Sequence, residues 1–238
     1  MNIPNTVIVI PTYNEVDSIE PLVSRLRATG IKGIGFIIID DGSSDGTCSK
    51  LQKIASGATY YFKIIQRGSK MGIGSAYVEG FVAALRSEAQ YIVQMDADLS
   101  HPPELVKNLV KGLTHADVAS GSRYIDGGMM DSRCGFLRGL TSKFGNYFIR
   151  KLLGLNITDV TSGFKAYKRF VVETINLKEF KIKGFGFQVE MAYKCNRRGH
   201  TTVEIPYVFE KRNAGRSKFS VGIMFEAMVK LAFLRIRG

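Results

Sequence analysis

Continuous runs of apolar residues recur through the first hundred positions of the chain, and segments with helical spacing follow three of them. Neighbouring side chains of a strand point to opposite faces, so a run that is apolar at every position is typical of a strand covered on both faces. Four such runs are present, at residues 6–10, 35–39, 60–65 and 91–95. They predict an α/β protein with a mostly parallel sheet between helix layers.

The first of these helices has the clearest pattern. Its apolar positions recur at intervals of three and four residues and are Ile19, Leu22, Val23 and Leu26. Asp17 and Glu20 have the spacing of a capping box at its start, and Gly30 is expected to end it. Further helices are predicted over residues 47–55 and 76–85.

The alternation of strands and helices is less regular after residue 100. No internal repeat or obvious linker divides this part of the chain. The elements expected from its apolar spacing are a helix over 102–113 with proline in its first turn, a strand within 116–124, an amphipathic helix over 136–153, a strand within 201–209 and a last helix near 220–236.

The composition is that of a globular protein, with 45% hydrophobic and 23% charged residues among 238. The three cysteines, Cys48, Cys134 and Cys195, form no Cys-x-x-Cys pair. A disulfide framework and a zinc site are therefore not expected, and a reducing compartment is. The sequence contains no signal-peptide pattern and no apolar run of roughly 20 residues, the length that spans a bilayer.

The net charge of +12 is concentrated in two segments. Residues 133–151 contain five basic and no acidic residues, and residues 211–238 contain seven basic residues against the single Glu226. Charge gathered in this way indicates an anionic partner, such as a phosphorylated substrate, an anionic membrane or nucleic acid.

Polar residues stand at the carboxyl ends of three of the four early strands. The segment PTYNE (11–15) ends the first strand. Asp40 and Asp41 end the second, and Asp96 and Asp98 follow the fourth. Ligands of an open parallel sheet bind beyond the carboxyl ends of its strands, so these side chains are expected to share one site.

Carboxylates gathered at one edge of a sheet repel each other unless a cation or hydrogen-bond donors offset the charge. Asp96 and Asp98, on one side of a short turn, suit a hard divalent metal with oxygen ligands, Mg²⁺ or Mn²⁺. Asp40 can accept hydrogen bonds from the N–H edge of a base. We therefore expect the aspartates, Asp41 included, to face a nucleotide and its metal.

Each signal also has a simpler interpretation. An Asp-x-Asp triplet can be a solvated turn, and Asp45 and Thr47 could serve only to cap the following helix. The glycines after Lys70 lack the spacing of a dinucleotide fingerprint. His101 and His200 have no partners at metal-ligand spacing, so helix-cap or surface positions are expected for both.

Taken together and in order, the motifs resemble those of the GT-A fold glycosyltransferases of family two, and within them the polyprenol-phosphate (dolichol-phosphate) mannose synthases. The resemblance covers essentially the whole chain. MDADLSHPPE combined with GSRY and TSGF is specific to this subgroup, whereas PTYNE and DDGSSD mark only the wider family. The segments that carry it are PTYNE (11–15), IDDGSSDGT (39–47), KMGIGSAYVEG (70–80), MDADLSHPPE (95–104), GSRY (121–124), VTSGFKAYKR (160–169) and RNAGRSK (212–218).

The resemblance implies a GT-A (nucleotide-diphospho-sugar transferase) fold, a GDP-mannose donor and a divalent cation, Mg²⁺ or Mn²⁺. Asp96 and Asp98 would hold this metal on the diphosphate. Ser100 stands where relatives often have a glutamine that helps the metal, so a water is expected as the third contact. The positions matched to nucleotide binding are Pro11, Tyr13, Glu15, Asp40, Lys70, Asp96 and Ala97.

The resemblance also implies an isoprenoid-phosphate acceptor. A phosphate monoester is largely dianionic near neutral pH, since its second pKa is about 6, and it can attack without a dedicated general base. The site must instead attract an anion, which arginines do well through bidentate contacts. The expected catalytic residues are Asp98, Arg123 and Arg138. The candidates for the acceptor phosphate are Arg123, Arg138, Ser142, Arg212 and Lys218.

Two segments are expected to lie at a membrane surface. Residues 136–153 combine an apolar side with nearby cations, and residues 221–237 are strongly apolar. Helices that pack in the core are the alternative. The expected organisation is a catalytic domain over 1–219, with a nucleotide-binding half (1–100) and an acceptor half (101–219), followed by a C-terminal interfacial helix over 220–238.

The sequence thus predicts an inverting glycosyltransferase that moves mannose from GDP-mannose to a polyprenyl phosphate, peripheral at the cytoplasmic face of a membrane. Some relatives continue into transmembrane helices, so the chain is expected to be a peripheral form, to rely on a membrane-anchoring subunit, or to be truncated before such helices. One alternative is a polyprenyl-phosphate glucosyltransferase that uses UDP-glucose. The other is a non-catalytic basic protein that binds membrane or nucleic acid. Nucleic acid is not an expected partner, because an acidic cluster does not help to grip an anion unless a metal is present.

Overall fold

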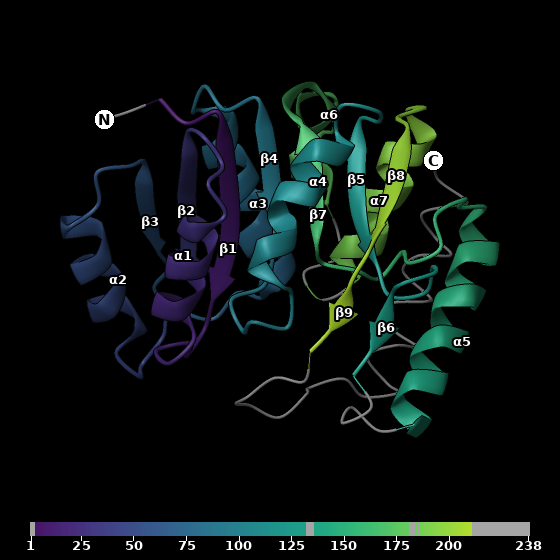
Figure 1. Cartoon of the computed structure of the whole chain (residues 1–238), viewed down its shortest axis with the longest axis horizontal. Coiled ribbons are helices and arrows are strands. Elements are labelled where there is room, and N and C mark those ends of the chain that lie inside the picture. The colour runs from purple at the N-terminus through teal and green to yellow at the C-terminus, as the bar shows by residue number, and fades with distance from the viewer. Residues whose placement is uncertain (1–2, 132–135, 181–183, 185, 211–238) are drawn as a thin grey trace.

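A single seven-stranded sheet with the order β3-β2-β1-β4-β7-β5-β8 forms the centre of the molecule (Figure 1). The computed structural model describes residues 3–131, 136–180, 184 and 186–210, with the backbone alone at 136–138. The strands of the sheet are β1 (Thr6–Thr12), β2 (Ile34–Asp40), β3 (Phe62–Gln66), β4 (Tyr91–Gln94), β5 (Val118–Ser122), β7 (Lys165–Lys168) and β8 (Thr202–Pro206).

Most neighbouring strands of this sheet are parallel, as predicted. The pairs β1–β2, β1–β4, β2–β3 and β5–β8 are parallel, and β7 alone runs antiparallel to its neighbours β4 and β5. β4 belongs to the first hundred residues and β7 to the later part, so the two halves of the chain share one sheet. A separate two-stranded sheet pairs β6 (Met129–Met130) with β9 (Val208–Phe209).

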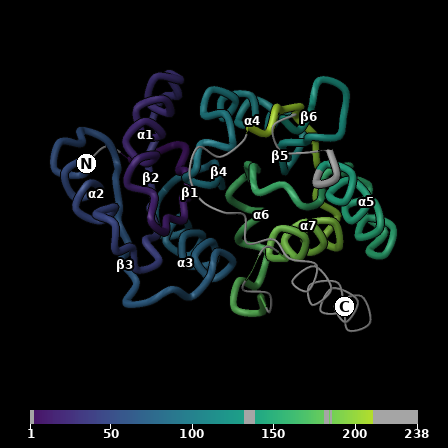
Figure 2. The backbone as a smooth tube through the Cα atoms, turned by 90° about the horizontal axis from the view of Figure 1, so that it is seen from below, coloured from purple at the N-terminus to yellow at the C-terminus, as the bar shows by residue number. Residues whose placement is uncertain are grey.

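Helices cover both faces of the large sheet (Figure 2). One face packs against α1 (Ile19–Ala28), α2 (Thr47–Ser56) and α4 (Val106–Gly112), which follows the 3₁₀ turn η1 (Pro103–Leu105). The other face packs against α3 (Ile73–Leu85), α6 (Arg169–Thr174) and α7 (Phe187–Arg197), with the 3₁₀ turn η3 (Leu177–Glu179) between the last two. The long helix α5 (Phe136–Leu153) lies at one edge of the molecule.

The apolar runs of the sequence supply both cores at once. Val7 and Val9 of β1 pack under α3, whereas Ile8 and Ile10 of the same strand pack under α1. Alternate side chains of one strand thus enter opposite layers, which is why every position of the run is apolar. Gly80 allows α3 to lie close to the sheet, because an added Cβ would stand 2.3 Å from Cγ1 of Val9.

Two expectations about these elements need correction. The capping box at Asp17 is wrong: α1 begins at Ile19, and Ser18 in the cap position makes no side-chain cap hydrogen bond. The strand β7 was not predicted, because its four residues are too short to show a pattern within VTSGFKAYKR. The helix over 136–153 is confirmed by α5, and the helix expected at 220–238 falls outside the described residues.

Within the part of the chain that the structure describes, no helix combines the length and the apolar character needed to cross a bilayer. The division into a nucleotide-binding half and an acceptor half stays a prediction.

Candidate active site

Two loops at the carboxyl ends of β1 and β2 are joined by short hydrogen bonds. The backbone amide of Asn14, a residue whose φ of 58° is in the left-handed region, donates to Oγ of Ser43 at 2.9 Å. The side-chain oxygen Oδ1 of Asn14 accepts from the amide of Ser44 at 3.0 Å. The amide of Glu15 donates to Oγ1 of Thr47 at 2.9 Å. These bonds hold the PTYNE segment against the DDGSSDGT segment, so the two predicted nucleotide-binding loops lie side by side.

Asp40 is buried at the end of β2, and donors of the protein surround its carboxylate. Oδ1 accepts from the amide of Ser43 at 3.0 Å, and Oδ2 accepts from the hydroxyl of Thr12 at 3.1 Å. The thiol of Cys48 lies 3.4 Å from Oδ1. The carboxylate is therefore oriented before any ligand arrives, and its contact with a base stays a prediction.

Asp41 has a structural partner, which corrects the expectation that it faces a ligand. Its carboxylate accepts from Arg67 and from the amides of Met71 and Gly72, each at 2.9 Å. Burial raises the pKa of Asp41, but these hydrogen bonds and the Arg67 charge outweigh it, so the pKa lies below the ordinary value. Asp41 thus fixes the segment that begins α3.

Lys70 and Tyr13, both predicted to bind the nucleotide, meet at the surface. Nζ of Lys70 stands 3.4 Å from the centre of the Tyr13 ring, a cation–π contact. Tyr13 follows β1 directly, where Pro11 is the next-to-last residue of the strand. The structure thus brings an exposed aromatic ring and a cation to the same edge as Asp40.

The Asp96–Ser100 turn follows β4 and is held from three sides. The buried hydroxyl of Tyr77 donates to Oδ1 of Asp96 at 2.8 Å, and Nδ1 of His101 accepts from the Asp96 amide at 3.1 Å. The hydroxyl and amide of Ser100 donate to Oδ1 of Asp98 at 2.6 and 3.0 Å. Ser100 thus orients Asp98, a role that the expectation of a bridging water did not include.

Leu99 gives this turn an uncommon backbone conformation. Its φ of 61° is in the left-handed region, which non-glycine residues rarely adopt and which costs free energy. Ala97, between the two aspartates, is buried in the core. Such a turn persists only where its surroundings hold it, and the contacts of Tyr77, His101 and Ser100 provide that support.

The residues of this turn suit a hard divalent cation. Mg²⁺ and Mn²⁺ bind through one or two carboxylates and complete their shell with waters and substrate phosphates. The hydroxyl of Tyr77 donates to Oδ1 of Asp96, and Ser100 donates to Oδ1 of Asp98. In each aspartate, these hydrogen bonds therefore end on one carboxylate oxygen, Oδ1. No cluster of three or more candidate histidine, cysteine, aspartate or glutamate ligands is present among the described residues.

His101 is a residue that sequence reasoning missed. It was expected at a helix cap or on the surface, but it is buried and stacks on Phe164 with the ring centres 5.1 Å apart. Its position in LSHPP has no periodicity that could have indicated burial. Tyr77 was missed for another reason: it lies within the KMGIGSAYVEG motif, where an apolar helix face predicts only core packing.

Arg123 of the GSRY segment forms a buried ion pair with Asp159. Nε and Nη2 of Arg123 donate to the two carboxylate oxygens at 2.7 and 2.8 Å, and Nη2 also donates to Oγ1 of Thr161 at 2.7 Å. Burial raises the pKa of Asp159, but the Arg123 charge and its hydrogen bonds outweigh it, so the pKa lies below the ordinary value. Any contact of Arg123 with a phosphate would therefore have to use Nη1.

Further polar bonds hold the segment around Asp159. The carboxylate of Glu204 accepts from the amides of Thr158 and Asp159 at 2.7 and 3.0 Å. Oδ1 of Asn146, on α5, accepts from the amide of Val160 at 2.9 Å. Residues from α5, from β8 and from the segment directly after β5 thus contact one loop that precedes β7.

The other acceptor-phosphate candidates differ in what can be said of them. Ser142 of α5 lies 2.8 Å from the hydroxyl of Tyr124, which brings the helix to the GSRY segment. The structure describes the backbone of Arg138 but not its side chain. Arg212 and Lys218 lie outside the described residues. Their roles stay predictions.

The TSGF segment connects the aspartate turn to Arg123. A Cβ placed on Gly163 would stand 3.7 Å from Oδ1 of Asp96, and Thr161, two residues earlier, binds Arg123. His101, which holds the Asp96 amide, lies 6.2 Å from the ring of Phe209, over which the Arg123 guanidinium stands at 5.5 Å. The acidic turn and the arginine thus belong to one connected neighbourhood.

Comparison with known proteins identifies the family. Residues 7–175, well over half of the chain, match the family described as glycosyl transferase family 2. The chain is 38% identical over 234 residues to the polyprenol monophosphomannose synthase of Mycolicibacterium smegmatis, covering 98% of this chain and 88% of that protein. It is 37% identical over 223 residues to the undecaprenyl-phosphate mannosyltransferase of Micrococcus luteus, covering 94% and 90%.

Solved structures support the same assignment at the level of the fold. A crystal structure of glucosyl-3-phosphoglycerate synthase from Mycobacterium tuberculosis, in complex with Mn²⁺, UDP and phosphoglyceric acid, matches with a TM-score of 0.71. The match covers 98% of this chain and 78% of that chain. At 19% sequence identity, this similarity shows the fold alone. With the GT-A sheet and the family match over most of its length, the chain belongs to glycosyltransferase family 2.

Proposed function

We propose that this protein transfers mannose from GDP-mannose to a polyprenyl phosphate, with inversion, at the cytoplasmic surface of a membrane. The observation that carries the proposal is its 38% identity, over 98% of its length, to a protein named polyprenol monophosphomannose synthase. The contacts around the Asp96 turn and around Arg123 support it, because they bring the acidic turn and Arg123 into one neighbourhood.

On the donor side, Tyr13, Lys70 and Asp40 would contact the nucleotide, together with Pro11 and Glu15. Asp96 and Asp98 would hold Mg²⁺ or Mn²⁺ on the diphosphate. When bound, such a cation stabilises the negative charge of the leaving nucleoside diphosphate. Tyr77 and Ser100 support this role by fixing the two carboxylates before the donor binds.

On the acceptor side, the phosphate of the lipid would act as the nucleophile. The protein must overcome the repulsion between two anionic reactants, and positive side chains do this. Arg138, Arg212 and Lys218 would supply direct contacts. Arg123 would contribute through Nη1 and its positive charge, while its pair with Asp159 keeps the GSRY segment in place.

The exposed face of α5 supports a membrane surface as the place of reaction. Leu140, Phe144, Tyr147 and Phe148 are 44–71% exposed and follow one another along a single helix face. Asn146, Ile149 and Leu153 on the opposite face are buried. With Lys143, Arg150 and Lys151 on the same helix, this pattern fits a helix that lies in the headgroup region of an anionic membrane.

A donor-by-acceptor screen tests the proposal. The purified chain is incubated with labelled GDP-mannose or UDP-glucose, with a polyprenyl phosphate in detergent or vesicles, and with Mg²⁺, Mn²⁺ or EDTA. Metal-dependent formation of lipid-linked mannose is the expected result. Lipid-linked glucose without mannose would replace the proposal by the glucosyltransferase alternative, and a membrane-anchoring subunit would be indicated if membranes restored an activity that the chain alone lacks.

A further inference from the structure

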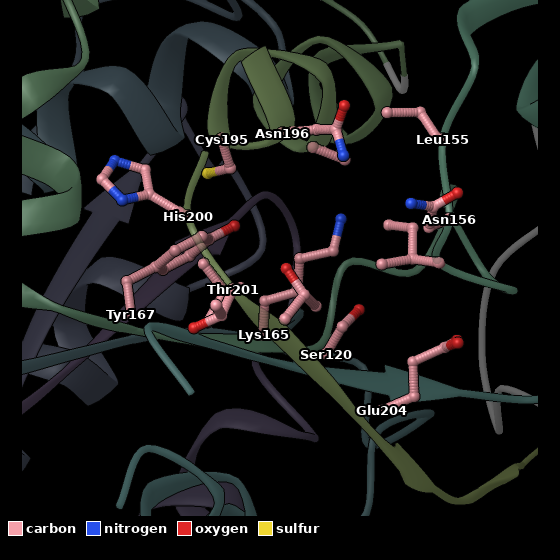
Figure 3. A pocket seen from close by; sticks show the side chains of 14 residues that line it. Ser120, Leu155, Asn156, Lys165, Tyr167, Cys195, Asn196, His200, Thr201 and Glu204 are labelled. Atoms are coloured by element: carbon pink, nitrogen blue, oxygen red, sulfur yellow. The ribbon is translucent and has the colours of Figure 1, made fainter. Parts of the chain in front are cut away.

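A cavity of about 390 Å³ lies in the later half of the molecule (Figure 3). Its floor is formed by β5, β7 and β8, one wall by α7, and another by residues 155–157. None of the residues predicted to bind the donor, the metal or the acceptor phosphate lines it. The established family membership and the proposed function leave it without a role.

Lys165 is the central feature of this cavity. Its side chain is fully buried, and Figure 3 shows its ammonium group in the middle of the lining residues, between Asn196 and Asn156. The described residues offer it one hydrogen bond, to the carbonyl of Gln188 at 3.3 Å, and no carboxylate within 4.0 Å. An ammonium group has three donors, so two of them have no acceptor among the residues that the structure describes.

A buried charge with so few partners is costly, and a bound anion would offset the cost. Burial lowers the pKa of Lys165 to about 8, while Asp159 and Glu204 act in the opposite direction. At neutral pH the side chain is therefore still mostly protonated and is the principal cation of the cavity.

Ser120 supplies a second unmet donor beside it. Its hydroxyl is buried and has no hydrogen-bond partner among the described residues. Ser120 and Lys165 are direct cross-strand partners of β5 and β7, so their side chains lie on the same face of the sheet, close together. The cavity is thus lined by two hydrogen-bond donors from adjacent strands, as many as a carboxylate has oxygens.

The remaining lining residues limit the ligand further. Glu204 also lines the cavity, and its carboxylate is already bound to the amides of Thr158 and Asp159. Its negative charge disfavours a dianion such as a phosphate monoester. Leu155, Ile157 and Ala192 provide apolar walls, and the exposed Asn156 and Asn196 lie at the mouth.

We propose that this cavity is a binding site for a small monoanionic carboxylate with an apolar body, whose oxygens accept hydrogen bonds from Nζ of Lys165 and Oγ of Ser120. The ligand would enter between Asn156 and Asn196. Residues 155–157, which form one wall of the cavity, belong to the same loop as Asp159. A bound ligand would therefore add contacts to the segment that fixes Arg123.

Titration with benzoate, with benzamide as its neutral counterpart and phenyl phosphate as a dianion, tests the proposal. Lysine labelled with ¹³C at Cε gives one NMR resonance per lysine, and the resonance that is absent from Lys165→Arg is that of Lys165. Calorimetry measures affinity at constant ionic strength. Benzoate is expected to shift the Lys165 resonance to saturation, and benzamide and phenyl phosphate are not. The Lys165→Met variant should bind benzoate at least tenfold more weakly, and Ser120→Ala about fivefold more weakly, the effect of one lost hydrogen bond.

Lys168→Met is the matched control, since Lys168 lies on the same strand but faces away and pairs with Asp117. It should bind benzoate as the wild type does. The absence of a saturable shift at Lys165 would overturn the proposal, as would unchanged affinity in Lys165→Met or tighter binding of phenyl phosphate than of benzoate. If Lys165→Met does not fold, the wild-type titration and Ser120→Ala decide the matter alone.

Discussion

The donor edge and the acceptor edge of the candidate site are held together by different kinds of contact. At the donor edge, the loops after β1 and β2 exchange bonds between backbone amides and short side chains, such as Asn14 with Ser43 and Glu15 with Thr47. At the acceptor edge, Arg123 and Asp159 are joined through their side chains, and Glu204 and Asn146 bind the same loop from two further elements. The donor edge thus rests on two adjacent strands, whereas the acceptor edge depends on the whole later half.

Both edges contain a buried ion pair between arginine and aspartate. The Arg67–Asp41 pair fixes the start of α3, and the side chains of both residues are nearly inaccessible to solvent. The Arg123–Asp159 pair fixes a loop that has no strand or helix of its own at that point. We therefore expect damage to the acceptor edge to spread further than damage to a loop bond at the donor edge.

The largest expected effect is that of Asp159→Ala. Removing one partner of a buried pair leaves an uncompensated charge, which costs about 3–5 kcal/mol in the free energy of unfolding. Urea denaturation measures it. Glu104→Ala, which breaks the exposed Arg25–Glu104 pair, should cost less than about 1 kcal/mol.

A cost for Asp159→Ala no greater than that for Glu104→Ala would contradict the expected difference between a buried and an exposed ion pair. The pH dependence provides a second check with Asp159→Asn. The pKa of Asp159 lies below 3.8 in the folded state, so its contribution to stability is present above pH 3.8 and is lost as the pH falls through the folded-state pKa. The stability gap between wild type and Asp159→Asn should close in acid.

Asp98→Ala should lower the rate of mannosyl transfer on the order of 10³-fold, because a ligand of the charge-stabilising metal is lost. The free energy of unfolding should fall by less than for Asp159→Ala, since Asp98 is half-buried and its loss removes the acceptor of the Ser100 hydrogen bonds. Steady-state rates over a range of Mn²⁺ concentrations measure the effect. A near-normal rate at saturating metal would remove Asp98 from the site.

Tyr77→Phe should lower activity by about 10–100-fold, because the hydroxyl positions the Asp96 carboxylate. The apparent affinity for Mn²⁺ should weaken in parallel, which a purely structural role would not cause. The ring still stacks on Phe187, so the fold is retained. Tyr167→Phe is the control: it removes an equally buried hydroxyl, bound to Gln94, and should leave the metal dependence unchanged.

The smallest effects are expected on α5. Phe144→Ser and Tyr147→Ser should each weaken binding to anionic vesicles by about tenfold, because an aromatic ring that enters the membrane is lost. Flotation with vesicles measures the binding. Phe170→Ser, an exposed aromatic on α6, should have no effect. Equal losses from all three variants would show that exposure, and not the α5 face, determines binding.

Much of the donor edge could be predicted from the sequence, because its contacts are local to strands with a clear pattern. Four apolar runs located β1, β2, β3 and β4, and the polar residues that follow three of them do lie at one edge. The role of Asp41 could not be predicted, because its partner Arg67 lies 26 positions away on a different strand end. A carboxylate looks the same in sequence whether it binds a ligand or an arginine.

The sequence alone determined the α/β layering, the family and the amphipathic character of residues 136–153, since periodicity and motif order are properties of the chain itself. Only the tertiary structure decided which charges neutralise each other and which buried donors lack a partner. Arg123 with Asp159, His101 beneath Asp96, and Lys165 beside Ser120 are separated by intervals that no local pattern records. The free energy of a buried charge depends on its neighbours in space, and these are known only once the sheet has assembled.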